Sequence, residues 1–281
     1  MEIKEIKYFD IHAHLHFSIF ENKIKKIEEN LKEGVWFLLI GTAKKTSKEA
    51  IEYLPNGVWG GIGLHPHHVW TDYEDEFEGK IEKEENFDEI FYQEILDKNN
   101  EKVRVIGEFG LDYFYFDNLS EKEILEIKKR QWEVCEKQII FAKKNKKSLM
   151  IHLRSKDQSA FFDFYDIIKN YLPVKTNIHF YSGNLEITKK FLDFGFYFSF
   201  GGVITFKNAN LQRDLINYIP IENLLTETDS PYVSPEPFRG KINEPKNVKI
   251  ILEKIAEIKK IEKEKLKEVI FFNSLKYLDL I

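Results

Sequence analysis

"FDIHAHLH", residues 9–16, joins a short apolar run to three histidines at alternate positions. Side chains alternate between the two faces of an extended strand, so these histidines would share one face with Asp10. Two neighbouring imidazoles, His12 and His14, could then reach one cation, although a strand can also carry such a pair by chance. A doubly wound open sheet would place a glycine-rich phosphate turn directly after its first strand, and this stretch has none. The stretch therefore favours a different α/β architecture.

Eight β-rich apolar segments alternate with amphipathic stretches along the chain, which is the pattern of a parallel α/β fold. The expected strands are Ile6–His12, Val35–Gly41, Val58–Leu64, Val103–Gly110, Ser148–His152, Lys175–Phe180, Phe196–Phe200 and Leu224–Thr228. The expected helices are Ile19–Lys32, Lys45–Leu54, Phe87–Asn99, Ser120–Lys144, Gln158–Tyr171, Leu185–Phe194, Ala209–Tyr218 and Pro245–Lys259. Eight β and α units within about 250 residues are typical of a TIM barrel. We therefore predict a (β/α)8 barrel that forms one domain over residues 1–281, with an additional C-terminal helix.

Composition limits the partners of the protein. The chain has 281 residues, of which 43% are hydrophobic, so it can bury a sizeable core. A net charge of −5 gives no sign of a basic nucleic-acid coat or of a protein that coats membranes. The single cysteine excludes an intramolecular disulfide, the N-terminus has no apolar signal region, and no run approaches the ~20 apolar residues that span a bilayer. We expect a cytoplasmic protein with no membrane partner, and a monomer rather than an obligate oligomer.

Metal-ligand residue types collect at the C-terminal ends of the expected strands, where barrels of this class carry their chemistry. They are His12 and His14 on the first strand, Glu108 on the fourth, His152 on the fifth, His179 on the sixth and Asp229 after the eighth. All 8 histidines lie in these segments, in "FDIHAHLH" or in "GLHPHH" (residues 63–68), and none lies in an expected helix. Each residue alone could be a hydrogen-bonded core histidine, a turn carboxylate or a helix cap. Together they would bury uncompensated polar groups unless cations satisfied them.

We therefore predict two divalent metal ions per subunit. The first would be held by His12, His14, Glu108 and Asp229, and the second by Glu108, His152 and His179, so that Glu108 bridges them. Imidazole and carboxylate ligands suit Zn²⁺ and accept Mn²⁺, Ni²⁺ or Fe²⁺, Mg²⁺ gains less from so many histidines, and the pattern does not choose among the five. Paired ions lower the pKa of a bound water and clamp the oxygens of a displacement. Hydrolysis is the expected chemistry, with Glu108 and Asp229 as catalytic residues and Asp229 as the general base.

Two cationic or hydrogen-bonding residues at neighbouring strand ends are candidates for substrate binding. Arg154 in "HLRS" presents a planar fork that matches a pair of phosphate oxygens, and His65 in "GLHPH" can donate to a third oxygen. Arg154 could instead form a salt bridge within the barrel rim. If the substrate is an anion, this local site has to attract it, because the chain as a whole is acidic.

Seven ordered motifs resemble those of the TatD family of metal-dependent hydrolases, within the amidohydrolase-like TIM barrels. They are "FDIHAHL", "GLHPH", "IGEFGLDYF", "IHLR", "IHFYSG", "TETDSPY" and "RGKINEPKNV", which span nearly the whole chain. The resemblance implies that the six residues above are metal ligands and that His65 and Arg154 contact a substrate phosphate. It also implies that Asp112 and Glu227 orient the ligands. The family is associated with metal-dependent deoxyribonuclease activity, so DNA or a nucleotide phosphodiester is the expected substrate.

One departure from the family concerns Val69–Glu101, which is longer than usual and includes "DYEDEFE" (residues 72–78). Barrel topology places its first part on the active-site face, where five acidic residues would repel a nucleic-acid backbone. This favours DNA ends or single strands over long duplexes. An amidase or lactonase remains the alternative, although related enzymes of those kinds often bridge their metals with a modified lysine where this chain has Glu108. A non-catalytic metal-binding scaffold is the third reading.

Overall fold

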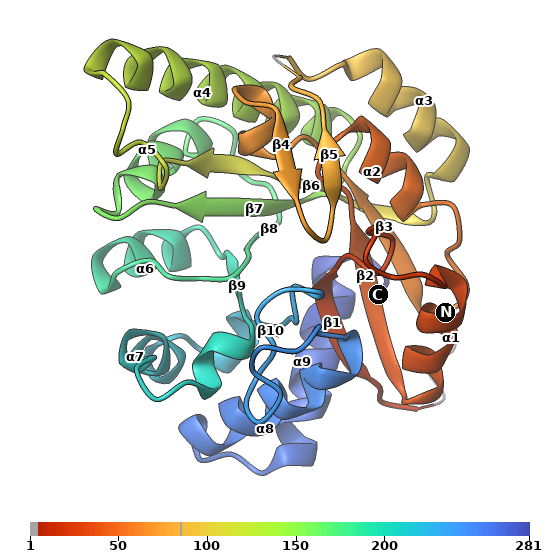
Figure 1. Cartoon of the computed structure of the whole chain (residues 1–281). Coiled ribbons are helices and arrows are strands. Elements are labelled where there is room, and N and C mark those ends of the chain that lie inside the picture. The colour runs from red at the N-terminus through yellow and green to blue at the C-terminus, as the bar shows by residue number, and fades with distance from the viewer. Residues whose placement is uncertain (1–4, 85) are drawn as a thin grey trace.

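A computed structural model describes residues 5–84 and 86–281 of the chain. In this part of the chain, eight parallel strands form one sheet that curves into a nearly closed barrel, in the order β1-β2-β3-β6-β7-β8-β9-β10 (Figure 1). The strands are β1 (Tyr8–Ala13), β2 (Val35–Ile40), β3 (Val58–Ile62), β6 (Val103–Asp112), β7 (Ser148–Arg154), β8 (Thr176–Ile178), β9 (Tyr197–Phe200) and β10 (Leu224–Thr226). The predicted α/β barrel is therefore confirmed.

Helices follow the strands and cover the outside of the barrel (Figure 1). They are α1 (Lys23–Lys32), α2 (Lys44–Ala50), α3 (Glu89–Asn99), α4 (Glu121–Lys144), α5 (Ser159–Ile168), α6 (Leu185–Asp193), α7 (Asn210–Tyr218), α8 (Val248–Lys259) and α9 (Lys263–Tyr277). A capping box forms at the start of α4, where Ser120 and Glu123 cap each other's backbone N–H groups. The first helix begins later than predicted because the Asn22 side chain accepts from the Lys25 N–H and sets its N-terminus. None of the described helices is long and apolar enough to cross a membrane.

The C-terminal helix α9 closes the N-terminal end of the barrel. Inward-facing side chains of the strands, such as Phe9 and Trp59, form one buried cluster with Phe271 and Leu275 of α9. The rings of Phe9 and Trp59 stack with centroids 5.8 Å apart. The Tyr277 hydroxyl donates to the Leu149 carbonyl at 2.7 Å. The barrel therefore has a packed floor, which leaves only the opposite end open for chemistry.

The first and last strands meet in a seam that closes the barrel. The Thr226 hydroxyl donates to the Phe9 carbonyl at 2.7 Å. Beyond the end of β10, the Asp229 N–H donates to the His12 carbonyl at 2.9 Å, and the His14 N–H donates to the Ser230 carbonyl at 2.7 Å. Residues at the two ends of the sheet are thus held together at the mouth.

A short antiparallel hairpin between β3 and α3 was not predicted. Its strands are β4 (Tyr73–Asp75) and β5 (Gly79–Ile81). Acidic residues are poor strand formers, so the segment carries no strand signal in the sequence. The turn instead depends on Asp75, whose carboxylate accepts from the N–H groups of Phe77 and Glu78 at 2.8 and 3.1 Å. The hairpin lies at the mouth of the barrel, as topology led us to expect for this insertion.

Candidate metal centre

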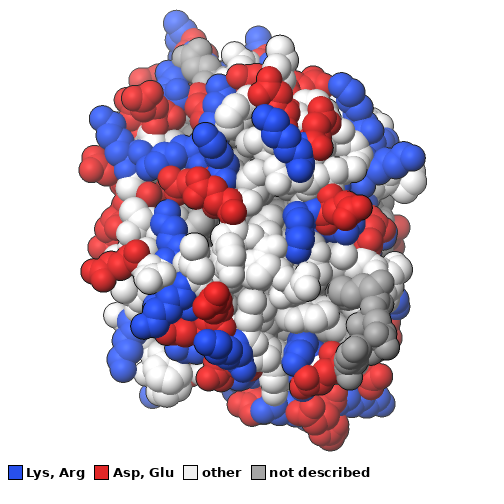
Figure 2. Space-filling model, turned by 90° about the vertical axis from the view of Figure 1, so that its right-hand side faces the viewer, with Lys and Arg blue, Asp and Glu red and all other residues white. Residues whose placement is uncertain are grey.

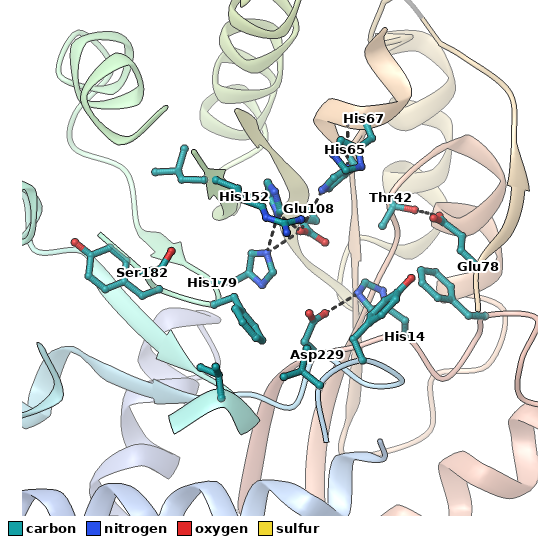
Figure 3. Close-up of a pocket in the computed structure, with 18 of the residues that line it drawn as sticks. His14, Thr42, His65, His67, Glu78, Glu108, His152, His179, Ser182 and Asp229 are labelled. Carbon is teal, nitrogen blue, oxygen red and sulfur yellow. Dashed lines mark hydrogen bonds and ion pairs between the residues drawn. The ribbon is translucent and has the colours of Figure 1, made fainter. Parts of the chain in front are cut away.

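A pocket of about 390 Å³ opens at the C-terminal ends of the strands (Figure 3). Seven of the eight predicted site residues line it, namely His14, His65, Glu108, His152, Arg154, Asp229 and His179. The eighth, His12, lies directly beneath and is fully buried. Strand ends that are far apart in the sequence therefore bring all eight side chains into one place.

A β-bulge in β6 aims Glu108 into the pocket. The register of β6 against β7 shifts between Ile106 and Phe109, so two residues of β6 oppose one of β7. Val105 packs inside the barrel, and simple alternation from it would turn Glu108 outward. Gly107 allows the shift: it has φ 150°, and a Cβ there would lie 2.5 Å from the Met150 carbonyl oxygen. A similar shift in β1, between Asp10 and Ala13, includes His12.

Glu108 lies at the centre of the cluster, and its two carboxylate oxygens face different groups of histidines. Oε1 lies 2.8 Å from His152 Nδ1 and 2.7 Å from His179 Nε2. Oε2 lies 3.3 Å from His12 Nε2. Burial opposes ionisation of this carboxyl, but His179, His12 and His65 hold the pKa of Glu108 well below its usual range. Glu108 is thus an ionised acceptor shared by both halves of the site.

The first half of the site consists of His12, His14 and Asp229 around Glu108 Oε2. His14 Nε2 lies 3.0 Å from His12 Nε2 and 3.3 Å from Asp229 Oδ1. His14 Nδ1 lies 2.6 Å from the Ile40 carbonyl, which can only accept, so Nδ1 carries the proton and Nε2 of the neutral ring has a lone pair. Burial lowers the pKa of His12 to about 4, so its ring is neutral. Burial opposes protonation of His14 too, but Asp229 and Glu108 raise the pKa of that imidazole, so a cation would take the place of a proton at its Nε2. Both imidazoles can therefore act as ligands.

The second half contains His152 and His179 around Glu108 Oε1. His152 Nδ1 lies 3.2 Å from His179 Nε2. On its other side, His152 Nε2 lies 3.0 Å from Asp112 Oδ2, and this contact holds the ring so that Nδ1 faces the site. His67 Nε2 also lies 3.0 Å from Asp112 Oδ2. Asp112 thus lies behind His152, a predicted ligand, where it can orient the ring as the resemblance implies, whereas its contact with His67 was not anticipated.

Glu227 lies behind His179 in a comparable position. Its Oε2 atom lies 3.8 Å from His179 Nδ1 and accepts from the Ser199 hydroxyl at 2.6 Å. Burial raises the pKa of Glu227 to about 7. Burial also opposes protonation of His179, but the carboxylates of Glu108, Glu227 and Asp229 raise the pKa of that imidazole to about 10. The surplus of negative charge favours a cation at this position.

The donor set fits metal ions. Three groups have all their ligand atoms within 4.8 Å of one another, and these are His12 with His14 and Glu108, His12 with His179 and Asp229, and His65 with Glu108 and His152. Imidazole nitrogens that face each other at 3.0 Å direct lone pairs into a common space, which a divalent cation would stabilise. The grouping differs from our prediction in two respects: it places His179 with His12 and Asp229, which we assigned to the other ion, and it adds His65 to the candidate ligands. The cause is its Nε2 atom, which lies 3.6 Å from Glu108 Oε1.

Arg154 borders the cluster without taking part in it. Its guanidinium lies over the Phe114 ring, 4.0 Å from the centroid, and Nη1 donates to the Tyr115 hydroxyl at 3.1 Å. Within residues 5–84 and 86–281, no carboxylate lies within ion-pair distance of Arg154. The rim salt bridge that we considered as the alternative is therefore absent from this part of the chain. Aromatic contacts orient the fork and leave its charge for a ligand.

Several residues of the pocket had no signal in the sequence. Glu78 comes from the unpredicted hairpin, and its carboxylate accepts from the Thr42 hydroxyl. Val203 lies in the 3-10 helix after β9 (Gly202–Thr205), Gln212 lies in α7, and Tyr232 lies in the loop after β10. His16 is buried but does not line this pocket.

Comparisons with known proteins agree with this description. A family model described as TatD related DNase matches residues 9–279. An uncharacterized metal-dependent hydrolase of Mycoplasma genitalium, MG009, is 33% identical over 282 residues, which cover 96% of this chain and 98% of the relative. The uncharacterized metal-dependent hydrolase YabD of Bacillus subtilis is 33% identical over 93% of this chain and 94% of its own. The crystal structure of YjjV, a TatD homologue from Escherichia coli, has the same fold, with a TM-score of 0.79, 21% identity and 98% coverage of both chains.

Proposed function

Because the chain belongs to the TatD family of metal-dependent hydrolases, we propose that it hydrolyses phosphodiester bonds in DNA, at ends or in single strands. One observation carries this proposal: Arg154 lines the same pocket as the cluster of histidines and carboxylates. Among the described residues, its guanidinium forms no ion pair with a carboxylate. A phosphate can bind the fork of Arg154 through two oxygens while its remaining oxygens face the cluster. Neutral amides and lactones carry no negative charge that the Arg154 guanidinium could bind in addition to the proposed metal ions.

The cluster would hold two divalent ions. His12, His14, Asp229 and Glu108 Oε2 would hold one, and His152, His179 and Glu108 Oε1 the other, with His65 adjacent. Ions bound there would lower the pKa of water and stabilise negative charge on the phosphate. Glu108 would contribute one oxygen to each half and so fix their separation.

Three residues of the chain would act on the substrate itself. Arg154 would bind and orient the phosphate, and His65 would donate to another of its oxygens. The Asp229 carboxylate has 17% of its side-chain surface exposed, so it can be reached by water from the pocket. Its free oxygen would accept the proton of the attacking water as the new P–O bond forms and the P–O bond to the leaving sugar oxygen breaks, and that oxygen would take a proton from solvent. Asp229 has φ 56°, and this left-handed backbone aims the side chain back over the mouth.

The distribution of charge supports short or single-stranded substrates. Figure 2 shows one side of the molecule, where lysines and arginines alternate with acidic residues on both sides of an uncharged band. No basic tract that could follow a duplex backbone is visible on this face. Aromatic side chains at the mouth, including Tyr115, can stack on an unpaired base. We infer that binding depends on the pocket, where Arg154 and these aromatic side chains lie.

The test is hydrolysis by the purified protein loaded with Mn²⁺ or Zn²⁺. The substrates are a labelled single-stranded deoxyoligonucleotide, the same sequence as a duplex, bis(4-nitrophenyl) phosphate and a panel of lactones. We expect turnover of the single strand and of the chromogenic phosphodiester, with slower cleavage of the duplex. Turnover of lactones alone would contradict the proposal. A matched variant, Arg154→Met, should raise KM for the oligonucleotide more than for an uncharged ester.

A further inference from the structure

The hairpin places one carboxylate inside the pocket. Glu78 directly precedes β5, its residue surface is only 4% exposed, and it lines the same pocket as the metal cluster. Its Oε1 atom accepts from the Thr42 hydroxyl and lies 3.5 Å from His68 Nε2. In Figure 3, Glu78 and Thr42 lie on one side of the cluster and Ser182 lies on the other. The other acidic residues of "DYEDEFE" do not line this pocket.

The position of Glu78 is fixed on both sides of the hairpin tip. The Tyr232 hydroxyl, from the loop after β10, donates to Asp75 Oδ1 at 2.9 Å. The Ser18 hydroxyl, from the loop after β1, donates to the Phe77 carbonyl at 2.8 Å. The rings of Phe77 and Tyr232 meet with centroids 5.2 Å apart. These contacts hold the Glu78 side chain at the pocket wall instead of leaving it free in solvent.

The pocket consequently has two sides of opposite charge. Arg154 ends β7, whereas Thr42 follows β2, and β3 and β6 lie between those strands in the sheet. An anionic group is attracted on the Arg154 side and repelled on the Glu78 side. A carboxylate has about four acceptor positions, so Glu78 can accept a hydrogen bond from a ligand in addition to that of Thr42. Hydroxyl groups meet this requirement and phosphate dianions do not.

We propose that Glu78, held by Thr42, selects nucleotide ends that carry a free sugar hydroxyl and rejects ends that carry a phosphate. The inference rests on the proposed phosphodiesterase function. With the scissile phosphate at the metal cluster, the terminal sugar extends toward the hairpin and its hydroxyl donates to Glu78. A terminal phosphate at that place meets a buried carboxylate, whereas Arg154, the one Lys or Arg among the described residues that line the pocket, lies on the opposite side. The acidic insertion thus determines specificity for the kind of chain end.

The test compares four single-stranded deoxyoligonucleotides of one sequence with an internal label, which end in a 3′-hydroxyl, 3′-phosphate, 5′-hydroxyl or 5′-phosphate. For the end that enters the pocket, we expect the wild-type kcat/KM to be about tenfold higher with the hydroxyl than with the phosphate. Glu78→Gln should reduce this ratio to about threefold or less. Glu76→Gln is the matched control, because it removes the same charge from an exposed position of the same hairpin.

Binding provides a readout that does not depend on turnover. Calorimetry with thymidine 5′-monophosphate and thymidine 3′,5′-bisphosphate should show weaker binding of the bisphosphate to the wild type. Glu78→Gln, but not Glu76→Gln, should remove most of that difference. Equal wild-type rates with hydroxyl and phosphate at both ends would overturn the inference, as would equal effects of the two variants. If no oligonucleotide is cleaved with any of the metal ions tested, the proposed phosphodiesterase function fails as well. Cleavage without selection between the ends contradicts only the inference about Glu78.

Discussion

Asp112 lies behind the predicted metal ligands, and its replacement tests the proposed metal centre. Its Oδ2 atom contacts both His152 and His67 at 3.0 Å. Asp112→Asn weakens the hydrogen bond that the side chain accepts from His152, so the imidazole ring is no longer held in one orientation. Metal affinity should therefore fall by about 10- to 100-fold while the fold is retained. Calorimetric titration with Zn²⁺ measures this, with Asp117→Asn, an exposed loop carboxylate, as the control. Equal affinities in the two variants would contradict the assignment.

Asp229 is the residue whose replacement tests the proposed proton transfer. Asp229→Asn keeps the size of the side chain and one oxygen but removes the base, so kcat should fall by about 10² to 10⁴. Affinity for a phosphorothioate oligonucleotide that resists hydrolysis should change little, because Arg154 and His65 provide the phosphate contacts. Single-turnover kinetics and fluorescence anisotropy separate the two effects. An unchanged single-turnover rate would show that another group accepts the proton.

At the scale of single residues, the sequence could predict those site residues that barrel topology alone brings together. His12, Glu108 and Asp229 lie at the ends of strands, and these ends meet at the mouth whatever the loops do. Glu78 could not be found in this way, since its partner Thr42 is 36 residues away and its segment has no strand pattern. The role of His65 was assigned to substrate alone, because only three-dimensional distances show its closeness to Glu108.

The bulge in β6 is the element that most directly positions the site. Gly107→Ala would place a Cβ 2.5 Å from the Met150 carbonyl oxygen at φ 150°, so the strand must shift or lose pairing with β7. Gly34→Ala is the matched control, since its φ is also positive, 77°, but nothing lies within 4 Å of the added Cβ. We expect the control to lose about 1 kcal/mol of unfolding free energy and Gly107→Ala to lose several times as much. Urea denaturation measures both, and similar losses would mean that the close approach is unimportant.

The elements themselves were largely predictable, and the exceptions have physical reasons. The alternation of apolar segments with amphipathic stretches predicted the strands and helices to within a few residues. The hairpin was missed because its turn is formed by a side-chain carboxylate, that of Asp75, in a run of residues that disfavour strands. The β6 bulge was missed because glycines and an acidic residue near a strand end resemble an ordinary turn.

For the molecule as a whole, the seam between β1 and β10 connects metal binding to stability. His12 and His14 lie on one side of the seam and Asp229 on the other, so an ion held by all three would fasten the barrel closed. Metal that saturates the site at 100 times its Kd should add about 2.7 kcal/mol to the unfolding free energy. Chemical denaturation with and without a chelator measures the change, and hydrogen exchange should accelerate around β1 and residues 226–230 in the apoprotein. Identical unfolding curves would exclude a saturated metal site across the seam.

The architecture followed from the count of β and α units, because few folds accommodate eight of each in one chain of this size. What the sequence could not supply was the closure of the barrel. The β1–β10 contact uses few regular pairs and relies on contacts such as that of Thr226 with the Phe9 carbonyl. Such contacts depend on the complete curvature of the sheet and leave no local pattern.

The seam also has a consequence for the order of events during protein synthesis. His12 and His14 leave the ribosome early, but Asp229 follows more than 200 residues later, and α9, which packs the barrel floor, follows after that. A nascent chain can therefore form strands and helices in succession while its proposed metal site still lacks Asp229. The proposed centre becomes complete only after Asp229 and α9 have been translated, so hydrolytic activity would begin only once these segments have left the ribosome.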